Sequence, residues 1–469
     1  MHLYRHVQSG RGRAIMSPGA GPAGRVGGRM AGNPSGSGDS GATEACEEIA
    51  RPETILAGRT VSGMGFHTLD DFEVRGKRVL LRIDINSPVD ERTLRLVDGS
   101  KIKSSIPTVR ELMDRGAKVA IVAHQGRPGD YDFIPLNEHA AFLSQYLGRR
   151  VRYVDDLVGE HAHKAIASLS EGEAILLRNV RDLPDEQAKK SPEEHAQSQI
   201  VKALASDFEL FVNDAFGSSH RSHASLVGFT SVLPSAAGRL MEQEVKTLTQ
   251  VFQKPKRPST FIFGGTKFVD ALTVIEKLAE RESVDNIIIA GLAGYAYLWI
   301  LGKKIGAKTE KLASKDVTPE IIERAKALHR KHQGKLHLPI DAAVEVDEHR
   351  KEVSLDEVPE EAGIMDIGSE SIAEFSRIVT SSKTVFLSGP PGVFEKEDFC
   401  KGTCELFKAI VDSEAFSCMG GGHSSAAANK FGVRDLISYV STGGGALERL
   451  MLGKEMPSVE ALRSSAKKF

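Results

Sequence analysis

Cysteine and net charge are both scarce in this chain. The 469 residues include only four cysteines, Cys46, Cys400, Cys404 and Cys418, which are too few and too unevenly spaced for a disulfide framework, so we expect a reducing compartment. Cys400 and Cys404 stand four residues apart on one face of a predicted helix, which leaves a metal or redox pair open beside the simpler interpretation of small packed side chains. The formal charge is −2, from 61 basic and 63 acidic residues. No global field would therefore hold the chain on a nucleic acid or an anionic membrane.

Long apolar runs are also missing. The longest, from Ile287 to Leu301, is shorter than the roughly 20 residues that a membrane-spanning helix needs. Gly291 and Gly294 divide it into a strand and the start of a helix. The sequence therefore predicts no transmembrane segment. Apolar content of 41% and charged content of 26% are typical of a globular chain, and a chain of this length is expected to form two domains.

Residues 1–63 lack any hydrophobic period. They are rich in Gly, Ser, Pro and Arg, and such a segment cannot bury enough surface to offset its ordering entropy. We interpret it as a disordered extension, or as an upstream stretch that is not translated, with Met64 as the true start. An Arg-rich, acid-poor beginning without the apolar stretch of a secretory signal leaves a transit peptide as a third alternative.

From Phe66 onward, short Val/Ile/Leu runs alternate with amphipathic segments. Continuous apolar strands separated by helices are typical of parallel sheets covered on both faces. The first set of predicted strands is Arg78–Ile85, Lys118–Ala123, Ala174–Leu177 and Glu209–Val212; the second is Thr260–Phe263, Asn286–Ala290, Leu336–Ile340, Thr384–Leu387, Phe416–Met419 and Ile437–Val440. Helices are predicted between them, for example at Ile106–Arg115, Leu136–Tyr146 and Val269–Arg281. The fold class is thus α/β, with two doubly wound parallel-sheet (Rossmann-like) domains joined by a helical hinge.

The boundary between the domains is predicted in Leu233–Pro258, which reads as one helix from about Gly238 to Phe252 and then a Pro- and Lys-rich linker. We expect a first domain over residues 64–236, a hinge helix and linker over 237–257, a second domain over 258–445, and a C-terminal segment, 446–469, that returns toward the first domain. A stiff helix between two sheets suits hinge motion.

Charged and polar residues follow the strands of the first set. In open parallel sheets, ligands collect beyond the carboxyl ends of the strands. The residues at these ends are Arg82, Asp84, Asn86, His124, Arg127, Arg181, His220 and Arg221. Each alone is more often a surface ion-pair partner or a turn cap. Four arginines and two histidines on one rim would, however, be costly unless an anion neutralised them, and Arg forks suit phosphate and carboxylate oxygens. The first domain is therefore predicted to bind a small, multiply anionic ligand.

Glycines follow the strands of the second set instead. The loops are FGGTK (Phe263–Lys267), AGLAG (Ala290–Gly294), SGPPGVFE (Ser388–Glu395), MGGGHSS (Met419–Ser425) and STGGG (Ser441–Gly445). Glycine lets backbone N–H groups approach a ligand closely, and a helix N-terminus adds partial positive charge. One such loop is weak evidence, since many are only tight turns, but several on one sheet edge suit the phosphates of a nucleotide, which Lys267 can reach as a point charge.

Familiar alternatives are absent. No GxxxxGK[ST] motif occurs and no GxGxxG opens a helix after the first strand, which argues against P-loop and dinucleotide-binding oxidoreductase proteins. There is no obvious Ser/His/Asp or Cys/His constellation either. A cationic pocket facing glycine loops suggests phosphoryl transfer, which needs positioning and charge neutralisation more than a protein nucleophile.

The motifs, taken in order, resemble phosphoglycerate kinase over about residues 66–465. They are LLRIDINSP, AHQGRP, NDAFGSSHRSH, GGTK, LPID, GPPGVFE, GGGHSSAA and STGGGALE. AHQGRPGDYDF and GGGH are similar to the archaeal branch. The resemblance implies a monomeric, cytoplasmic enzyme of glycolysis and gluconeogenesis. It would transfer a phosphoryl group in line between 1,3-bisphosphoglycerate and ADP, reversibly giving 3-phosphoglycerate and ATP with Mg²⁺, in a cleft that closes at the hinge.

The resemblance also implies roles for individual residues. Those expected to hold the phosphoglycerate are Arg82, Asp84, Asn86, Lys101, His124, Arg127, Arg181 and Arg221. Those expected at the nucleotide are Gly265, Lys267, Gly291, Pro390, Glu395, Gly421, Gly422, His423 and Ser424. The catalytic set would be Arg82, Lys101, Lys267, Gly421 and Gly444, with Gly422 and Gly445 as further backbone donors. The metal ligand stays open: Asp341 in LPID is one candidate, although an Asp after a strand more often caps the next helix.

Several positions depart from the family pattern. Lys101 stands in KIK where the family has a transition-state arginine, so the charge is kept but the fork is lost. Ala271 replaces the second lysine of bacterial and eukaryotic members, Ser388 the asparagine of NGP, Arg178 the glutamate of ENxR, and His423 the magnesium-side aspartate. Three interpretations remain: an active phosphoglycerate kinase, which we favour; a paralogue that binds phosphate ligands but scarcely catalyses; and a kinase for another small acid.

Overall fold

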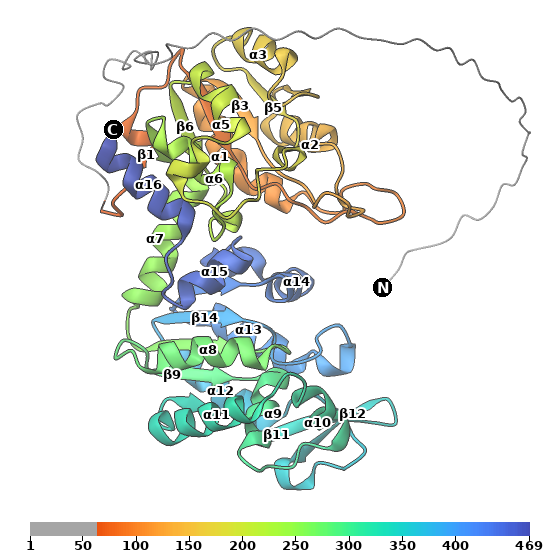
Figure 1. Cartoon of the computed structure of the whole chain (residues 1–469). Helices are drawn as coiled ribbons and strands as arrows, with labels where there is room; N and C mark the ends of the chain where they lie inside the picture. Colours follow the sequence, from red (N-terminus) through yellow and green to blue (C-terminus); the bar gives the residue numbers. More distant parts are fainter. Residues whose placement is uncertain (1–62) are drawn as a thin grey trace, which may run out of the picture. The chain divides into compact units, whose positions relative to one another are not determined.

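The computed structural model describes residues 63–469. The predicted extension over residues 1–63 therefore lies, apart from Gly63, outside the described residues. From residue 63 onward the chain forms two parallel sheets and one small antiparallel sheet (Figure 1). This arrangement confirms the predicted α/β class with two doubly wound sheets. No helix in residues 63–469 combines the length and apolar character needed to cross a bilayer.

The first sheet is parallel throughout, with strand order β1-β7-β6-β2-β3-β5-β4. Its strands are β1 (His67–Thr68), β2 (Arg78–Arg82), β3 (Lys118–Val122), β4 (Val151–Val154), β5 (Ala174–Leu177), β6 (Leu210–Asn213) and β7 (Ser235–Ala237). The helices along this part of the chain are α1 (Ser100–Asp114), α2 (Asn137–Leu147), α3 (Glu160–Ala167), α4 (Pro192–His195), α5 (Gln199–Leu204) and α6 (Ala224–Val227). Strands β1 and β7 were not predicted because they span only two and three residues. Strand β4 was not predicted because it reads VRYV and is not a continuous apolar run.

Both faces of this sheet are buried. Val79 and Leu81 of β2 pack in one cluster with α1 and α2, whereas Leu80 between them packs in a second cluster with α3 and α5. Successive strand residues point to opposite faces, so a strand covered on both sides needs apolar residues at every position. The central residues Val79, Leu80 and Leu81 meet that demand, and the strand ends at Arg82.

Helix α1 begins earlier than predicted. The prediction started it at Ile106, directly before Pro107. The structure starts it at Ser100 and runs it through Pro107. The side chain of Asp98 accepts a hydrogen bond from the Ser100 backbone N–H at 2.9 Å. Lys101 therefore lies on the first turn of a helix.

The second sheet has strand order β10-β9-β8-β14-β15-β16 and is also parallel throughout. Its strands are β8 (Ser259–Phe263), β9 (Asn286–Ile289), β10 (Leu336–His337), β14 (Thr384–Ser388), β15 (Phe416–Gly420) and β16 (Tyr439–Val440). The helices along this part are α8 (Phe268–Ala279), α9 (Gly291–Ile300), α10 (Ala307–Ala313), α11 (Pro319–His332), α12 (Ser369–Thr380), α13 (Lys401–Asp412), α14 (Gly422–Lys430) and α15 (Gly444–Met451).

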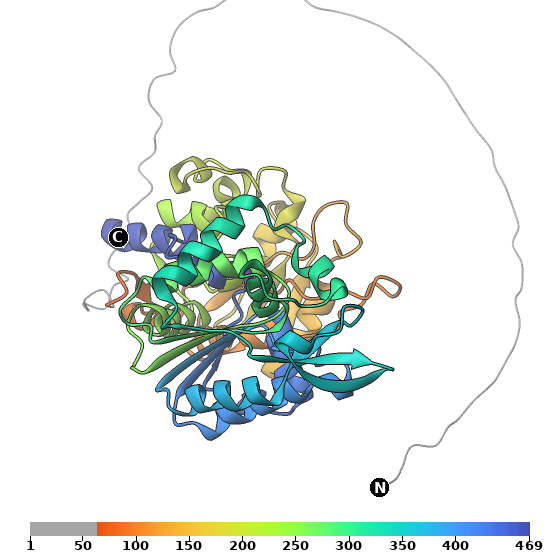
Figure 2. The ribbon, with the colours of Figure 1, turned by 90° about the horizontal axis from the view of Figure 1, so that it is seen from below.

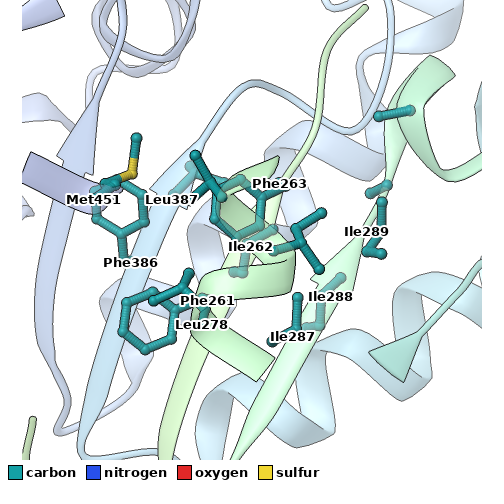
Figure 3. Close-up of a cluster of buried hydrophobic side chains, with 14 of the residues drawn as sticks. Phe261, Ile262, Phe263, Leu278, Ile287, Ile288, Ile289, Phe386, Leu387 and Met451 are labelled. Atoms are coloured by element: carbon teal, nitrogen blue, oxygen red, sulfur yellow. The ribbon is translucent and has the colours of Figure 1, made fainter. Parts of the chain in front are cut away.

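Aromatic residues anchor this sheet (Figure 3). Phe386 of β14 is fully buried, and its ring centroid lies 4.8 Å from that of Phe252 and 6.1 Å from that of Phe261. Phe252 belongs to α7 (Arg239–Gln253), the helix between the two sheets in the chain. The cluster therefore fixes the C-terminal end of α7 against the second sheet.

The first turn of α7 is fixed to the first sheet. The Asp214 carboxylate, just after β6, accepts hydrogen bonds from the backbone N–H groups of Leu240 at 2.9 Å and Met241 at 3.1 Å. It thereby caps the helix N-terminus. The helix that the sequence predicted from Gly238 to Phe252 is present, shifted by one residue.

The chain end contacts the first sheet again. Helix α16 (Pro457–Lys468) lies beside β1 and β7 (Figure 1). The Ser458 backbone N–H donates to the carbonyl of Ser219 at 3.2 Å. Residues from both ends of the described chain thus pack on one sheet.

A three-stranded antiparallel sheet, with order β12-β11-β13, was missed (Figure 2). Its strands are β11 (Asp341–Val346), β12 (His349–Ser354) and β13 (Ile364–Ile367). The two-residue turn between β11 and β12 has positive φ at Asp347 (50°) and Glu348 (65°). Strand β12 is mostly exposed and reads HRKEVS, which has no apolar period, so an expectation of parallel strands alone was incomplete.

Candidate active site

Arg82 and His124 meet at the carboxyl end of the first sheet. Arg82 ends β2 and is 1% exposed. Its Nε donates to the Ser225 hydroxyl at 2.9 Å, an Nη group donates to the Ile83 carbonyl, and the other lies 3.0 Å from His124 Nδ1. Burial lowers the pKa of His124 well below its usual range, which the nearby Asp84 only partly opposes. The imidazole is therefore neutral at pH 7, and Nδ1 accepts from Arg82.

The other predicted arginines gather around Arg82. Arg181 is also buried and donates to the carbonyl of Gly126. Burial, followed by the positive charges of Arg221, Arg82 and Arg127, lowers the pKa of Arg181 to about 10. Burial is the larger cause, and the repulsion from the three arginines adds to it. The structure thus brings the four arginines together, and an anionic ligand would relieve their repulsion.

Asp84 and Lys101 form an ion pair beside this cluster. Lys101 Nζ lies 3.8 Å from Asp84 Oδ2, and the Ser218 hydroxyl donates to the same oxygen at 3.1 Å. Burial raises the pKa of Asp84, but the charges of Lys101 and Arg82 and a hydrogen bond from the Asn86 N–H outweigh it and hold that pKa well below its usual range. Asp84 is therefore ionised throughout the physiological range.

Gln125 ties two of the predicted loops together, which the sequence did not reveal. It is 0% exposed. Its Oε1 accepts from the Ser87 N–H at 2.8 Å, and its Nε2 donates to the Ser87 carbonyl at 3.0 Å and to the Asp132 carbonyl at 3.2 Å. The Asn86 side chain completes the link by accepting from the Gly126 N–H at 2.8 Å. The AHQGRP motif located Gln125, but its partner Ser87 lies in a loop 38 residues away.

Behind Gln125 lies His139. Its Nε2 is 3.1 Å from Gln125 Oε1. Burial lowers the pKa of His139 to about 4, so the ring is neutral at pH 7. Because Oε1 can only accept, Nε2 carries the proton.

The second sheet ends at a cavity of about 400 Å³. Pairing of β14 with β8 and β15 places Phe263, Ser388 and Gly420 opposite one another, so the loops that follow them lie side by side. The predicted residues that line the cavity are Lys267, Gly421, Gly422, His423, Ser424, Gly444 and Gly445. Helices α14 and α15 begin at this cavity, and their first N–H groups are available to anionic oxygens.

Three other predicted residues lie behind the cavity wall. The Gly265 N–H donates to the Pro390 carbonyl at 2.8 Å. Gly291 has a φ of 58°, and a Cβ there would lie 2.8 Å from the nitrogen of Gly265. These contacts require glycine, because a side chain would separate the loops.

Glu395 is not brought to the cavity. It is exposed and is not among the lining residues. Its backbone carbonyl, with that of Phe394, accepts from Lys430 Nζ at 3.3 Å and 2.6 Å.

The loop at residues 441–445 contacts residues that follow strands of both sheets. Gly444 and Gly445 line the cavity. A Cβ at Gly445 would lie 3.2 Å from His220 Nε2, and one at Gly443 would overlap the ring of Phe216. This loop therefore carries cavity residues directly against the loop that contains Arg221.

Glu244 of α7 holds the same loop. Its carboxylate accepts from the Ser441 hydroxyl at 2.8 Å, and from the N–H and hydroxyl of Thr442 at 2.6 Å and 2.7 Å. Sequence analysis did not single out Glu244, whose partners lie almost 200 residues later in the chain. Helix α7 thus contacts the site as well as linking the sheets.

Metal ligands are limited in number. Residues 63–469 contain no group of three His, Cys, Asp or Glu side chains that could hold a metal. Asp341 accepts from the N–H groups of Glu370 at 2.8 Å and Ser371 at 3.0 Å, so it caps α12. Asp270 and Glu448 do line the cavity. Mg²⁺ often takes one or two carboxylates together with substrate phosphates, so these two residues fit it.

The departures from the family pattern fall in different places. Ala271 and Ser388 line the cavity, where Lys267 is the one lysine among the lining residues. Arg178 forms an ion pair with Asp182 at 2.8 Å, away from the arginine cluster. Cys400 is half-buried, just before α13, and Cys404 lies exposed on that helix.

Comparisons with known proteins agree with this geometry. The family model described as phosphoglycerate kinase matches residues 69–454. The phosphoglycerate kinase of Methanothermus fervidus is 40% identical over 403 residues, 86% of this chain and 98% of that protein. That of Methanothermobacter thermautotrophicus is 42% identical over 400 residues, 85% of this chain and 97% of that protein. The crystal structure of phosphoglycerate kinase from Pyrococcus horikoshii OT3 has a TM-score of 0.78 and 36% identity, covering 86% of this chain and all of that one. All three organisms are archaea, as the motifs predicted. The chain therefore belongs to the phosphoglycerate kinase family and is a phosphotransferase with a carboxyl group as acceptor.

Proposed function

We propose that this chain transfers a phosphoryl group reversibly between 1,3-bisphosphoglycerate and ADP, giving 3-phosphoglycerate and ATP in glycolysis and gluconeogenesis. The observation that supports this most is the loop at residues 441–445, which lines the cavity of the second sheet and packs against His220, next to Arg221. One loop thereby joins a cationic cluster to a set of backbone donors. We further propose a monomer located in the cytoplasm, where glycolytic substrates are found.

The arginine cluster is the proposed phosphoglycerate site. Arg82, Arg127, Arg181 and Arg221 would bind the phosphate and carboxylate oxygens, and Arg guanidinium groups match such oxygens bidentately. Arg82 and Arg181 are already desolvated. An anionic ligand that neutralises them would therefore gain binding energy by relieving the repulsion between them. Asp84, Asn86 and His124, from the adjoining loops, would fix the remainder of the ligand.

The cavity of about 400 Å³ is the proposed nucleotide site. Lys267 would meet the phosphates as a point charge, and the N–H groups at the starts of α14 and α15 would bind their oxygens. His423 and Ser424 belong to the first turn of α14. The backbone of Gly265, Gly291 and Pro390 would support the bound nucleotide, and Glu395, outside the cavity, is retained as the ribose contact.

Catalysis would consist of positioning and charge stabilisation. The transferring group would pass in line between the two sites, with Lys101, Gly421 and Gly444 donating to its oxygens. Bound Mg²⁺, held by Asp270 and Glu448, would supply charge neutralisation at the phosphates. Closure about α7 would bring the two sets together and exclude water.

The test is a coupled steady-state assay with 3-phosphoglycerate and ATP. The proposal predicts saturation in both substrates and a kcat within the usual range of about 1–10³ s⁻¹. Lys101 in place of arginine and Ala271 in place of lysine favour the alternative of a ligand-binding paralogue. Binding of both ligands by calorimetry without turnover would establish that alternative. Turnover of another small carboxylic acid in preference to 3-phosphoglycerate would point to a different kinase.

A further inference from the structure

A buried carboxylate lies behind the arginine cluster. Glu186 follows Arg181 in the loop after β5 and is 0% exposed. Its Oε1 accepts from the Ser225 hydroxyl at 2.6 Å, and its Oε2 accepts from the Ser225 backbone N–H at 2.8 Å. A buried carboxylate is costly unless it is paired and hydrogen-bonded. The positive charges of Arg82 and Arg181 act on it. The His223 ring lies 4.0 Å from its Oε1, but burial lowers the pKa of His223 to about 3, so that ring is neutral.

The Ser225 hydroxyl connects this carboxylate to Arg82. A hydroxyl has one hydrogen to donate and two lone pairs with which to accept. Glu186 takes the hydrogen, so the oxygen is left to accept from Arg82 Nε at 2.9 Å. The direction of both hydrogen bonds is therefore set by the carboxylate.

We propose that Glu186 is a positioning residue that, acting through Ser225, holds the Arg82 guanidinium in the orientation in which it binds the phosphoglycerate. The identity of this ligand rests on the proposed function, whereas the hydrogen-bonded relay from Glu186 through Ser225 to Arg82 does not. Arg82 is held at Nε by Ser225 and at its two Nη groups by Ile83 and His124. Since a guanidinium is planar, fixing Nε fixes the directions of the remaining N–H groups.

The negative charge matters in addition to the hydrogen bond. Arg82 lies among other arginines, and their charges would push its guanidinium away in the absence of a ligand. The Glu186 charge opposes this repulsion, more strongly than that of Asp84. An apolar residue of the same volume would fill the space but leave Arg82 and Ser225 without this support.

A purely structural role for Glu186 makes different predictions. The Ala224 N–H donates to the Glu186 carbonyl at 2.9 Å, and the Ser225 N–H donates to its side chain. These two bonds attach the loop to α6 and survive replacement of Ser225 by alanine. Only the hydroxyl contact reaches Arg82, so Ser225→Ala removes the relay and keeps the attachment.

The kinetic test compares Glu186→Gln, Ser225→Ala and the double variant. Burial raises the pKa of Glu186 to about 7, so measurements are made at pH 8, where its carboxylate is mostly ionised. Each single change should lower kcat/KM for 3-phosphoglycerate by about tenfold, the size expected for a hydrogen bond to a charged group, while the KM for ATP stays within about twofold. The double variant should have a kcat/KM no lower than that of the less active single variant, and neither change should lower kcat/KM further in an Arg82→Lys background. Losses in that background as large as those in the wild type, or a rise in the KM for ATP as large as the loss in kcat/KM, would overturn the proposal.

Asp185→Asn is the matched control. It removes one carboxylate charge at the adjacent position, where Asp185 accepts from the Gln199 N–H at 2.8 Å rather than facing Arg82. Its kcat/KM should stay within about twofold of the wild type. A loss as large as that of Glu186→Gln would show that any charge change in this loop is sufficient, which the proposal forbids.

A second measurement needs no turnover. In protein labelled with ¹⁵N-arginine, the Arg82 Nε–H signal is assigned by its absence in Arg82→Lys. Exchange of this hydrogen with water should quicken by about tenfold or more in Glu186→Gln and Ser225→Ala, since its acceptor is disturbed or lost. Unchanged exchange would overturn the relay. If the wild type fails to turn over 3-phosphoglycerate, the proposed function fails, but this exchange still decides the role of Glu186.

Discussion

Lys101 supports a specific prediction about the chemical step. It lies on the first turn of α1, with Nζ 3.8 Å from Asp84 Oδ2. It also shares a small cavity with Thr442, two residues before Gly444. Its charge thus lies between the arginine cluster and the start of α15. We expect Lys101→Met to lower kcat and to change both KM values little, because the contact would be made mainly in the transition state.

The magnitude follows from the exposure of the side chain. Transition-state arginines in other phosphoryl-transfer enzymes contribute about 10³–10⁵-fold in kcat. Lysine offers no fork, and the Lys101 side chain is 37% exposed. Solvent screening therefore places the contribution of Lys101 to kcat at the lower end of that range. The expected loss is about 10³-fold, or about 4 kcal/mol in activation free energy.

The assay is the coupled steady-state reaction with both substrates varied. Lys103→Met is the matched control, because Lys103 is exposed on the same helix two residues later; it should leave kcat unchanged. Lys101→Arg should raise kcat by restoring the fork. A Lys101→Met enzyme within about fivefold of the wild-type kcat would refute the reasoning, and an unchanged or lower rate in Lys101→Arg would mean that another group supplies this charge.

Three further predictions concern the supports of the site. Gln125→Leu should raise the KM for 3-phosphoglycerate by about tenfold, because the backbone N–H and carbonyl of Ser87 both lose the hydrogen bonds that they make with the Gln125 side chain. An unchanged KM would show that the two loops keep their positions without Gln125. Burial raises the pKa of Asp214 to about 7, so its favourable contribution is complete below the unfolded-state pKa of about 3.9 and is lost as pH rises through 7. The free energy of unfolding of the wild type should therefore fall by about 1.4 kcal/mol per pH unit relative to that of Asp214→Asn between pH 5 and 7. If urea unfolding gave the same difference between the two proteins at every pH, this prediction would be contradicted. Phe386→Ala should lower the free energy of unfolding by about 3–5 kcal/mol, whereas the half-exposed Phe416→Ala (39%) should cost far less; equal midpoints in denaturant would argue against the aromatic anchor.

Much of the fold was predictable because buried parallel strands have a simple sequence signature. RVLLR, KVAIV and TVFLS are apolar at their three central positions, since both faces of the sheet are covered. The residues that follow such strands meet at one sheet edge, so the arginine cluster and the glycine loops could be located without coordinates.

Other elements carry no such signature. β12 is a charged edge strand, recognisable only from its pairing with β11. A helix usually avoids proline in its interior, yet α1 runs through Pro107 and begins at Ser100 instead of the predicted Ile106. For Asp341 the sequence left a metal ligand open beside the commoner role of a helix cap, and its hydrogen bonds to Glu370 and Ser371 are those of a cap.

The supporting residues of the site were the hardest to find. Gln125, Glu186 and Glu244 act on partners 38, 39 and almost 200 residues away. No local pattern encodes such a contact, because it depends on the topology that brings the segments together. Glu395 was assigned to the nucleotide by its motif, and the structure leaves it exposed and not among the residues that line the cavity, so its contact with the ribose stays a prediction.

The most direct test of phosphoryl transfer between the two sites is its stereochemical course. ATP made chiral at the γ-phosphorus with oxygen isotopes is turned over with 3-phosphoglycerate, and the configuration of the transferred group is determined. A single in-line displacement between the arginine cluster and the glycine loops predicts inversion at phosphorus. Retention would require two displacements through a phosphorylated side chain and would contradict direct transfer.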